Sequence, residues 1–400
     1  MKPFFIILLI LAFGISACSP EPTAAPQIGT PLSTAAPLST PLPVAKLPVI
    51  SLLTPTSPPA PLAKITTIEP HGGRVSWLGS KNLLAFDETG SDGFDDVFTA
   101  NLDGSNKVCL TCSKKSLPQK HNGNPDWDPN GDYLAFQSED PGLKLKGQVL
   151  GEFMASPGVG INNNIWIMAA DGSHFWQITH VAAMGGARDA HFSPDGRKLV
   201  WAEIIAGGGI GQWVIKLADF GIYKGQPAVS NLTTLSPLSQ QWYQPSGMPP
   251  DQTRILFAGL AQGKGLFDSE IYTYNTLSKA TVRLTENNEW DEYAQFSPDG
   301  QWIAWTSSSG INQTHSASQS NMETQAVKTD AWIMRADGSG KQRLTRFNDP
   351  AAVEGNHAPV GVTCGELTWG PSSRSFAMHI QVGHDQSIVL VEFDPASLAK

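Results

Sequence analysis

The chain has 400 residues, only 16% of them charged, and a formal net charge of −9. Proteins that bind nucleic acid need clustered Lys and Arg to meet the phosphates, so this acidic balance predicts no nucleic-acid partner. The chain also contains 38 Gly, 30 Pro and 12 Trp. Few charges with many turn-forming and aromatic residues favour an all-β protein of short strands over a helical one.

The first 18 residues have the pattern of an export signal. Lys2 gives a positive start, an apolar run covers residues 4–13, and Ile-Ser-Ala-Cys follows at 15–18. The run is too short to span a bilayer and predicts a secretory signal. Small residues before a cysteine resemble the bacterial lipobox, which implies that Cys18 is lipidated. We expect an exported protein, anchored to the cell membrane or outer membrane and facing the periplasm or exterior. An ordinary signal peptide that contains a cysteine is the alternative.

The next segment, residues 19–63, is rich in Pro, Thr, Ser and Ala and contains almost no charge. Such a composition cannot bury a core, so we expect a disordered linker. It would act as a spacer between the lipid and a folded domain over residues 64–400.

The folded part is repetitive. Two apolar runs around a tight turn occur six times, over residues 76–88, 127–139, 192–203, 247–259, 296–308 and 368–380. A second pair of runs follows each copy, over residues 96–111, 164–179, 212–235, 270–285, 330–345 and, incompletely, 387–394. The turns carry Pro-Asp-Gly or Asp-Gly, in which Pro fixes φ and Gly accepts a positive φ. Six four-stranded antiparallel units predict an all-β, six-bladed β-propeller.

The sixth repeat stops after its third strand. Residues 64–68, Lys-Ile-Thr-Thr-Ile, precede the first repeat and have the β-branched alternation of a strand. We expect this N-terminal strand to complete the sixth blade and close the ring, which removes two sheet edges. The alternative is that these residues are an idle end of the linker.

Two motifs resemble the TolB-type propeller repeat, a WD-like repeat. They are Phe-Ser-Pro-Asp-Gly at 192–196 and 296–300, and Ala-Asp-Gly-Ser at 170–173 and 336–339. The resemblance covers residues 64–394 and implies a TolB-like propeller. TolB itself carries an α/β domain before its propeller, which this chain replaces with a lipid and a linker, so a Tol–Pal role is not implied. The same repeat occurs in binding proteins and beside hydrolase domains, so it predicts the fold rather than the function.

The two ends of the propeller are expected to differ. Turns between first and second strands, and between third and fourth strands, share one end and are mostly minimal. The opposite end receives long loops and crossovers, at residues 112–121, 139–163, 180–188, 205–211, 259–269, 307–329 and 346–363. Long loops in compact domains tend to be functional, so we expect this long-loop face to contact a ligand.

Polar residues gather where the chain enters the inner strands. They are His121, Asn122, Arg188, Asp189, His191, Tyr243, Asp291, Glu292 and Glu366. Because the six entries converge on one mouth of the central channel, these side chains could form a binding pocket or hold a divalent cation. The alternative is that they cap strands and hydrogen-bond between blades.

A second, partial likeness bears on the cation. Ala190-His191-Phe192 and Ala294-Gln295-Phe296 resemble the corresponding turns of oligogalacturonate lyases, propellers that hold a metal with His and Gln. A full set of ligands is not evident in this sequence, so no cofactor is firmly implied.

Cysteine spacing offers a third kind of site. Cys109 and Cys112 are spaced like a zinc half-site or a redox pair. In an exported protein a local disulfide is favoured, while the close spacing leaves a free thiol pair open. Cys364 is expected on an inner strand and unpaired.

Catalytic motifs do not support an enzyme. The sequence has no Gly-x-Ser-x-Gly, Walker or His-Glu-x-x-His motif. The leading hypothesis is a binding or scaffolding propeller of the cell envelope that contacts a protein, peptide or glycan through its long-loop face. The alternatives are a metal-dependent carbohydrate-active enzyme at the channel mouth, similar to oligogalacturonate lyase, and a propeller that serves only as a spacer.

Overall fold

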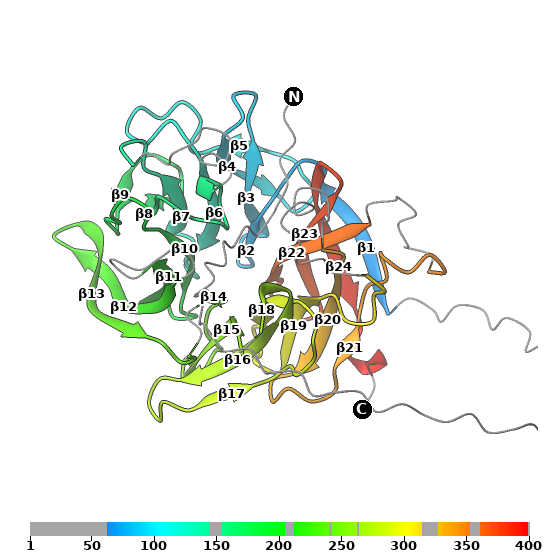
Figure 1. Cartoon of the computed structure of the whole chain (residues 1–400). Helices are drawn as coiled ribbons and strands as arrows, with labels where there is room; N and C mark the ends of the chain where they lie inside the picture. Colours follow the sequence, from blue (N-terminus) through cyan, green and yellow to red (C-terminus); the bar gives the residue numbers. More distant parts are fainter. Residues whose placement is uncertain are drawn as a thin grey trace, which may run out of the picture. The chain divides into compact units, whose positions relative to one another are not determined.

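The computed structural model describes residues 62–143, 154–204, 212–239, 242–261, 264–313, 327–352 and 361–398. In these ranges the strands form six four-stranded antiparallel sheets around a central axis (Figure 1). The predicted six-bladed β-propeller is therefore confirmed. The signal segment, Cys18 and nearly all of the linker lie outside the described residues.

The blades follow chain order, and the innermost strand of each blade is named first. Blade 1 contains β2 (Val75–Leu78), β3 (Leu83–Thr89), β4 (Asp95–Asn101) and β5 (Val108–Cys109). Blade 2 contains β6 (Asn122–Trp127), β7 (Tyr133–Glu139), β8 (Asn163–Ala169) and β9 (Phe175–Gln177). Blade 3 contains β10 (Ala187–Phe192), β11 (Lys198–Ile204), β12 (Trp213–Tyr223) and β13 (Gln226–Leu235).

The other three blades have the same order. Blade 4 contains β14 (Tyr243–Pro245), β15 (Arg254–Leu260), β16 (Ser269–Asn275) and β17 (Thr281–Arg283). Blade 5 contains β18 (Asp291–Phe296), β19 (Trp302–Ser307), β20 (Asp330–Arg335) and β21 (Gln342–Arg343). Blade 6 contains β22 (Val362–Trp369), β23 (Ser375–Val382), β24 (Asp385–Phe393) and β1 (Ala63–Glu69).

Helix is almost absent from the described ranges. Two short 3₁₀ helices, η1 (Leu266–Asp268) and η2 (Pro395–Ser397), are present. Among the described residues, no helix is long and apolar enough to cross a membrane.

The apolar core lies between neighbouring blades. Alternating side chains leave each sheet on both faces, so both faces are buried against the adjacent sheets. The largest fully buried side chains of the second strands are Phe86, Phe136, Trp201, Phe257, Trp305 and Phe376. Burial of each such side chain contributes roughly 1.5–3 kcal/mol, which holds the inner strands rigidly around the channel.

The Pro-Asp-Gly turns form as the sequence predicts. Gly196 and Gly300 have φ of 70° and 68°, values at which a Cβ atom would be strained. The Ser193 hydroxyl donates a hydrogen bond to Asp195 Oδ1 at 2.6 Å and accepts one from Lys198 N at 2.9 Å. These local bonds fix the turn that joins β10 to β11.

The outer strand of blade 6 comes from the start of the described chain. β1 pairs antiparallel with β24, with Ala63 opposite Phe393 and Lys64 opposite Glu392. The Lys64 and Glu392 side chains also form an exposed ion pair at 2.8 Å. The segment predicted to complete the blade therefore lies beside β24. That this pairing is what closes the ring stays a prediction.

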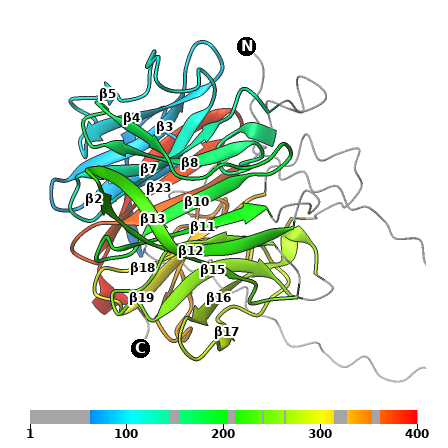
Figure 2. The ribbon, with the colours of Figure 1, turned by 90° about the vertical axis from the view of Figure 1, so that its left-hand side faces the viewer.

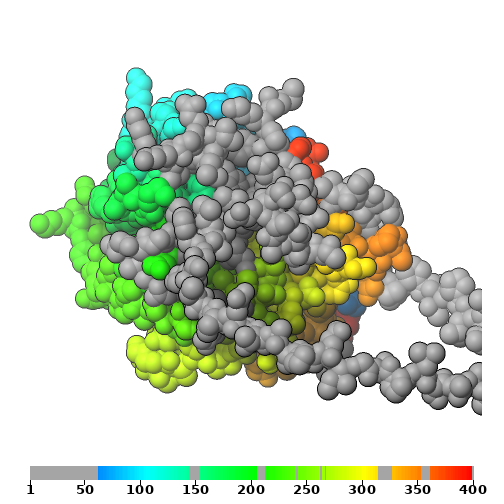
Figure 3. Space-filling model, viewed as in Figure 1, coloured from blue at the N-terminus to red at the C-terminus, as the bar shows by residue number. Residues whose placement is uncertain are grey.

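Blade 3 carries a hairpin that extends beyond the other blades. β12 and β13 have 11 and 10 residues, and the hairpin stands out from the rim of the propeller in Figures 1 and 3 and lies in front in Figure 2. Ile222, Tyr223 and Leu232 on this hairpin are about half exposed. Its turn is formed by Lys224 and Gly225, both with positive φ, as a two-residue hairpin turn requires.

Candidate functional site in the central channel

The inner strands are irregular where they enter the channel. Four of them shift register, between Gly123 and Asp126 in β6, Arg188 and His191 in β10, Glu292 and Gln295 in β18, and Cys364 and Leu367 in β22. Such bulges bend a strand and redirect its side chains. Asn124, Asp189 and Tyr293 lie inside these irregularities with φ of 52°, 53° and 54°. The left-handed backbone at these three residues therefore helps to determine which side chains face the channel.

Each of these three backbone N–H groups is held by the preceding blade. The bonds run from Asn124 N to Asp87 Oδ2 (2.8 Å), from Asp189 N to Gln137 Oε1 (3.3 Å) and from Tyr293 N to Gln244 Oε1 (3.2 Å). A left-handed residue costs energy and persists when its surroundings fix it. The bonds between blades supply that constraint and set the direction of the three side chains.

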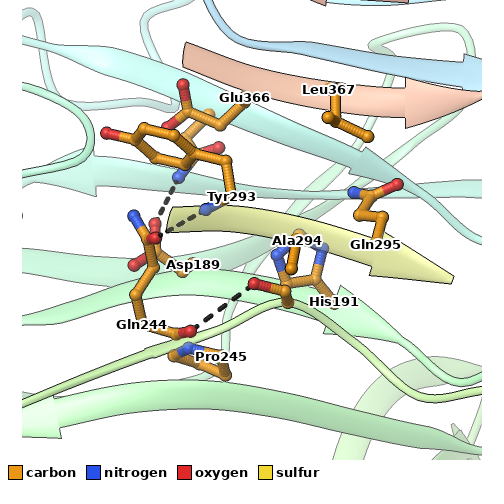
Figure 4. Close-up of a pocket in the computed structure, with 11 residues that line it drawn as sticks. Asp189, His191, Gln244, Pro245, Tyr293, Ala294, Gln295, Glu366 and Leu367 are labelled. Atoms are coloured by element: carbon orange, nitrogen blue, oxygen red, sulfur yellow. Dashed lines mark hydrogen bonds between the residues drawn. The ribbon is translucent and has the colours of Figure 1, made fainter. Parts of the chain in front are cut away.

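The redirected side chains line a cavity in the channel (Figure 4). Its empty volume, which includes space open to solvent, is about 280 Å³. The polar lining residues come from blades 2 to 6 and are Asn124, Asp189, His191, Gln244, Ser246, Tyr293, Gln295 and Glu366. Five blades thus contribute polar groups to one small space.

Asp189 is incompletely satisfied. Its Oδ1 accepts a hydrogen bond from Asn124 Nδ2 at 3.0 Å. Its Oδ2 lies 3.5 Å from Arg188 Nε, and this oxygen has no hydrogen-bond partner in the described part of the chain. The side chain is only 4% exposed, so bulk water does not replace the missing partner.

Glu366 is the second carboxylate of the cavity. Its Oε1 lies 3.2 Å from Arg74 Nε, and its Oε2 lies 4.0 Å from His379 Nδ1, which is too far for a hydrogen bond. Burial raises the pKa of Glu366 to about 7, although the positive charge of Arg74 opposes this. The carboxyl group is therefore close to half ionised at neutral pH.

His379 departs from the pattern of the other blades. The residues of β7, β11 and β19 that lie opposite the bulges are Phe136, Trp201 and Trp305. The equivalent residue of β23 is His379, which is buried, and neither ring nitrogen has a hydrogen-bond partner among the described residues. Burial, assisted by the charge of Arg74, lowers the pKa of His379 to about 3, so its ring is neutral at pH 7.

His191 faces the cavity from β10. Its Nδ1 lies 3.4 Å from Asp126 Oδ1. Burial lowers the pKa of His191, but the hydrogen bond to Asp126 and the charge of that carboxylate outweigh it, so the pKa lies above its ordinary value. Asp126 also accepts a hydrogen bond from Phe192 N at 2.9 Å, which ties blades 2 and 3 together.

Three of the nine residues predicted for the channel mouth meet at this cavity: Asp189, His191 and Glu366. The other six bond within or between blades, as the alternative interpretation expects. Their partners are Asp95 for His121, Pro118 and Lys120 for Asn122, Gly158 and Tyr243 for Arg188, Leu238 for Tyr243, Trp305 and Asn287 for Asp291, and Trp290 and Ser269 for Glu292.

Sequence reasoning missed Asn124, Gln244, Ser246 and Tyr293 as lining residues. A signal was available for two of them, because Asn124 and Tyr293 occupy the same position of the repeat as Asp189 and Glu366. That position lies shortly before the turn between first and second strands, which begins at Asp128, Ser193, Ser297 and Gly370. An alignment of the repeats would place Asn124, Asp189, Tyr293 and Glu366 in one column and so select these four together.

A second cavity lies at the turn-bearing end of the channel, where the sequence predicts mostly minimal turns. Its empty volume, counted in the same way, is about 750 Å³. Its walls include Trp77, Trp127, Trp369, Pro129, Pro194, Pro298, Pro371 and Asp126. His191, which lines the first cavity, contacts Asp126, which lines the second.

The cysteine pair is separate from the channel. Cys109 and Cys112 are joined by a disulfide with a Cα–Cα distance of 5.7 Å. Together with Asp96 they form the one close group of three metal-ligand side chains among the described residues, and both sulfurs are taken up by the disulfide. In the channel, Asp189, His191 and Glu366 could offer single ligands to a cation. Cys364 is buried and donates from its Sγ to Thr329 O.

The long-loop face falls partly outside the described ranges. Residues 144–153, 205–211, 262–263, 314–326 and 353–360 belong to it and are not described. The candidate site is therefore built from the inner strands alone.

No protein-family model matches the sequence, and no curated protein matches it. Among solved structures, a putative TolB from Agrobacterium tumefaciens is similar with a TM-score of 0.50 at 14% identity, over 82% of this chain and 91% of that one. TolB from Acinetobacter baumannii is similar with a TM-score of 0.45 at 16% identity, over 70% of this chain. The match spans 54% of that protein, so this chain covers about half of its length.

An oligogalacturonate lyase in complex with manganese has a TM-score of 0.46 at 12% identity, over 85% of this chain and 96% of that one. At such identities the likeness concerns the fold alone. The chain is a β-propeller protein with six blades. More closely, its fold is of the TolB-like type.

Proposed function

We propose that the protein is a binding module of the cell envelope, which holds a protein, peptide or glycan at the long-loop mouth of its central channel. The observation that carries this proposal is the convergence of polar side chains from five blades on one cavity, where Asp189 Oδ2 and Glu366 Oε1 have no hydrogen-bond partner among the described residues. Buried polar groups in folded proteins are normally satisfied. Groups left without partners at a cavity offer hydrogen bonds to a ligand that enters it.

The anchoring part of the proposal depends on the sequence. The apolar run at residues 4–13 and the lipobox-like Ile-Ser-Ala-Cys at 15–18 support export and lipidation of Cys18. The linker would then hold the propeller at a distance from the membrane surface.

The enzymatic alternative depends on a bound divalent cation. Elemental analysis of the full-length protein, before and after treatment with a chelator, separates the two functions. An ion bound in a one-to-one ratio, lost in Asp189→Asn but kept in Asp103→Asn, would put the metal-dependent enzyme first. Asp103 is the matched control because it lies in an exposed turn and bonds only locally to Ser105.

Screening the full-length protein on peptide and glycan arrays tests the binding function. The proposal expects a restricted set of related ligands, because a cavity of this size and polarity selects by chemistry. An array on which nothing binds above background, or on which binding follows only the net charge of the ligand without any common motif, would overturn it.

A further inference from the structure

We infer that the ligand group which enters the channel cavity is a cation, an ammonium or guanidinium group held between Asp189 and Glu366. This inference rests on the proposed binding function and names the chemistry of the ligand at that same site.

The charges around the cavity are unbalanced. Its lining, taken over the described residues, contains the carboxylates of Asp189 and Glu366 and neither Lys nor Arg. Asp87 lies close behind and acts on Glu366. The attraction between opposite charges is several-fold stronger inside a protein than in water, so a surplus of carboxylates in this small space favours a cation.

The two arginines near the cavity do not neutralise this surplus. Arg188 donates to Gly158 O at 2.7 Å and to Tyr243 O at 3.2 Å, and its guanidinium group stacks on Trp213. These contacts hold its outer nitrogens away from Asp189, whose Oδ2 keeps only the Nε atom at 3.5 Å. Arg188 is therefore committed to the contacts of blade 3 with blades 2 and 4.

Arg74 is shared between two carboxylates. Its Nε lies 3.2 Å from Glu366 Oε1, and its Nη1 lies 3.6 Å from Asp87 Oδ2. One guanidinium group thus faces two acids. His379 adds no charge, because its ring is neutral and its Nδ1 is 4.0 Å from Glu366 Oε2. Asp189 Oδ2 and Glu366 Oε1 therefore face the cavity without a hydrogen-bond partner among the described residues.

The size of the cavity agrees with a single charged group. The space open to the centre of a water-sized group is about 20 Å³, which admits one small group and not a whole small molecule. An ammonium or guanidinium group at the end of a flexible chain fits this space, while the remainder of the ligand would contact the mouth.

The affinity for a cation should depend on pH. The pKa of Glu366 is about 7, so its ionised fraction rises from roughly a tenth at pH 6 to roughly nine tenths at pH 8. Arg74 stays charged, His379 and Tyr293 stay neutral, and Asp87 and Asp189 complete the groups that face Glu366. His191 loses its proton in the same direction, which removes a repulsive charge. We therefore expect affinity to rise roughly tenfold from pH 6 to pH 8.

The test uses n-butylammonium and n-butylguanidinium chloride as probes, with neutral n-butanol as the matched control. Their binding to the full-length protein is measured by saturation-transfer NMR. Both cations should bind at least roughly tenfold more tightly than n-butanol at pH 8, a difference of about 1.4 kcal/mol. Asp189→Asn and Glu366→Gln should each remove most of this preference, and Asp103→Asn should leave it unchanged. Melting curves show whether each variant is folded.

The wild-type pH series keeps the test decisive if a variant fails to fold. Equal binding of n-butanol and the cations, or a cation affinity that is flat between pH 6 and pH 8, would overturn the inference. The binding function is tested separately by the arrays: ligands that bind there without a cationic group would sink the inference and leave the binding function standing.

Discussion

The pKa of Glu292 reflects the low polarity of the channel wall. The side chain is fully buried and accepts hydrogen bonds from Trp290 Nε1 at 2.5 Å and Ser269 Oγ at 3.2 Å. Burial raises its pKa to about 8, and the charge of Arg188 does not compensate for this. The folded protein therefore binds a proton at Glu292 more tightly than the unfolded chain does.

Glu292→Gln should make stability less dependent on pH. The stabilising effect of the protonated group is complete below its ordinary pKa near 4.5 and is lost as pH rises through about 8. The variant, which cannot ionise, should melt at a temperature close to the wild type at pH 5 and several degrees higher at pH 9. The exposed Glu286→Gln is the control, and parallel pH profiles for wild type and Glu292→Gln would contradict the prediction.

At the scale of single residues, the sequence predicts which polar side chains are present better than it predicts where they point. Asp189, His191 and Glu366 are recognisable as polar residues at strand entries, and they meet in the cavity. Asn124 and Tyr293 could not be assigned from alternation, because a bulge changes the direction of a side chain without changing the residue pattern. The exchange of an aromatic residue for His379 is visible in the aligned repeats and is the clearest sign of specialisation in blade 6.

Individual strands could be predicted where local rules suffice. Pro-Asp-Gly turns and alternating apolar residues specify β10, β11, β18 and β19, since the turn and the buried faces depend on adjacent residues. The length of the β12–β13 hairpin was harder to predict, because its turn uses Lys224 and Gly225 instead of Asp-Gly. The pairing of β1 with β24 depends on a partner more than 300 residues away, which local rules do not reach.

Ile65→Asp should test the role of β1. Ile65 is partly buried against the apolar cluster of blades 5 and 6 and pairs with Val391. If the pairing closes the ring, the charge should lower the free energy of unfolding of the whole propeller by about 1–3 kcal/mol. The exposed neighbour Thr66→Asp should change it by less than about 0.5 kcal/mol. Hydrogen exchange that shows loss of β1 alone, with an unchanged melting curve, would show that the strand does not close the ring.

The whole molecule is proposed to be a propeller tethered to a membrane by lipid. Cys18→Ala should therefore move the protein from the membrane fraction to the soluble fraction of cells, because the added acyl chains supply the membrane affinity. Immunoblots of the two fractions measure this. A variant that stays in the membrane fraction after a high-salt wash would contradict lipid anchoring through Cys18.

In this ring of blades, the fold and the cavity depend on different residues. Packing between blades holds the inner strands in place, and the cavity uses only the few side chains that these strands direct inward. The repeats therefore predict the scaffold from local pattern, while the ligand depends on positions at which the repeats differ.

The most direct measurement compares two tryptophan variants for binding of the strongest array ligand. Gln295 lines the cavity, and its backbone oxygen, which accepts from Trp369 Nε1, survives substitution. Leu277 is 82% exposed on a hairpin turn and serves as the matched control. If the channel is the binding site, Gln295→Trp should weaken binding at least roughly tenfold, about 1.4 kcal/mol, while Leu277→Trp leaves it unchanged. Unchanged binding in a folded Gln295→Trp variant would show that the ligand binds elsewhere.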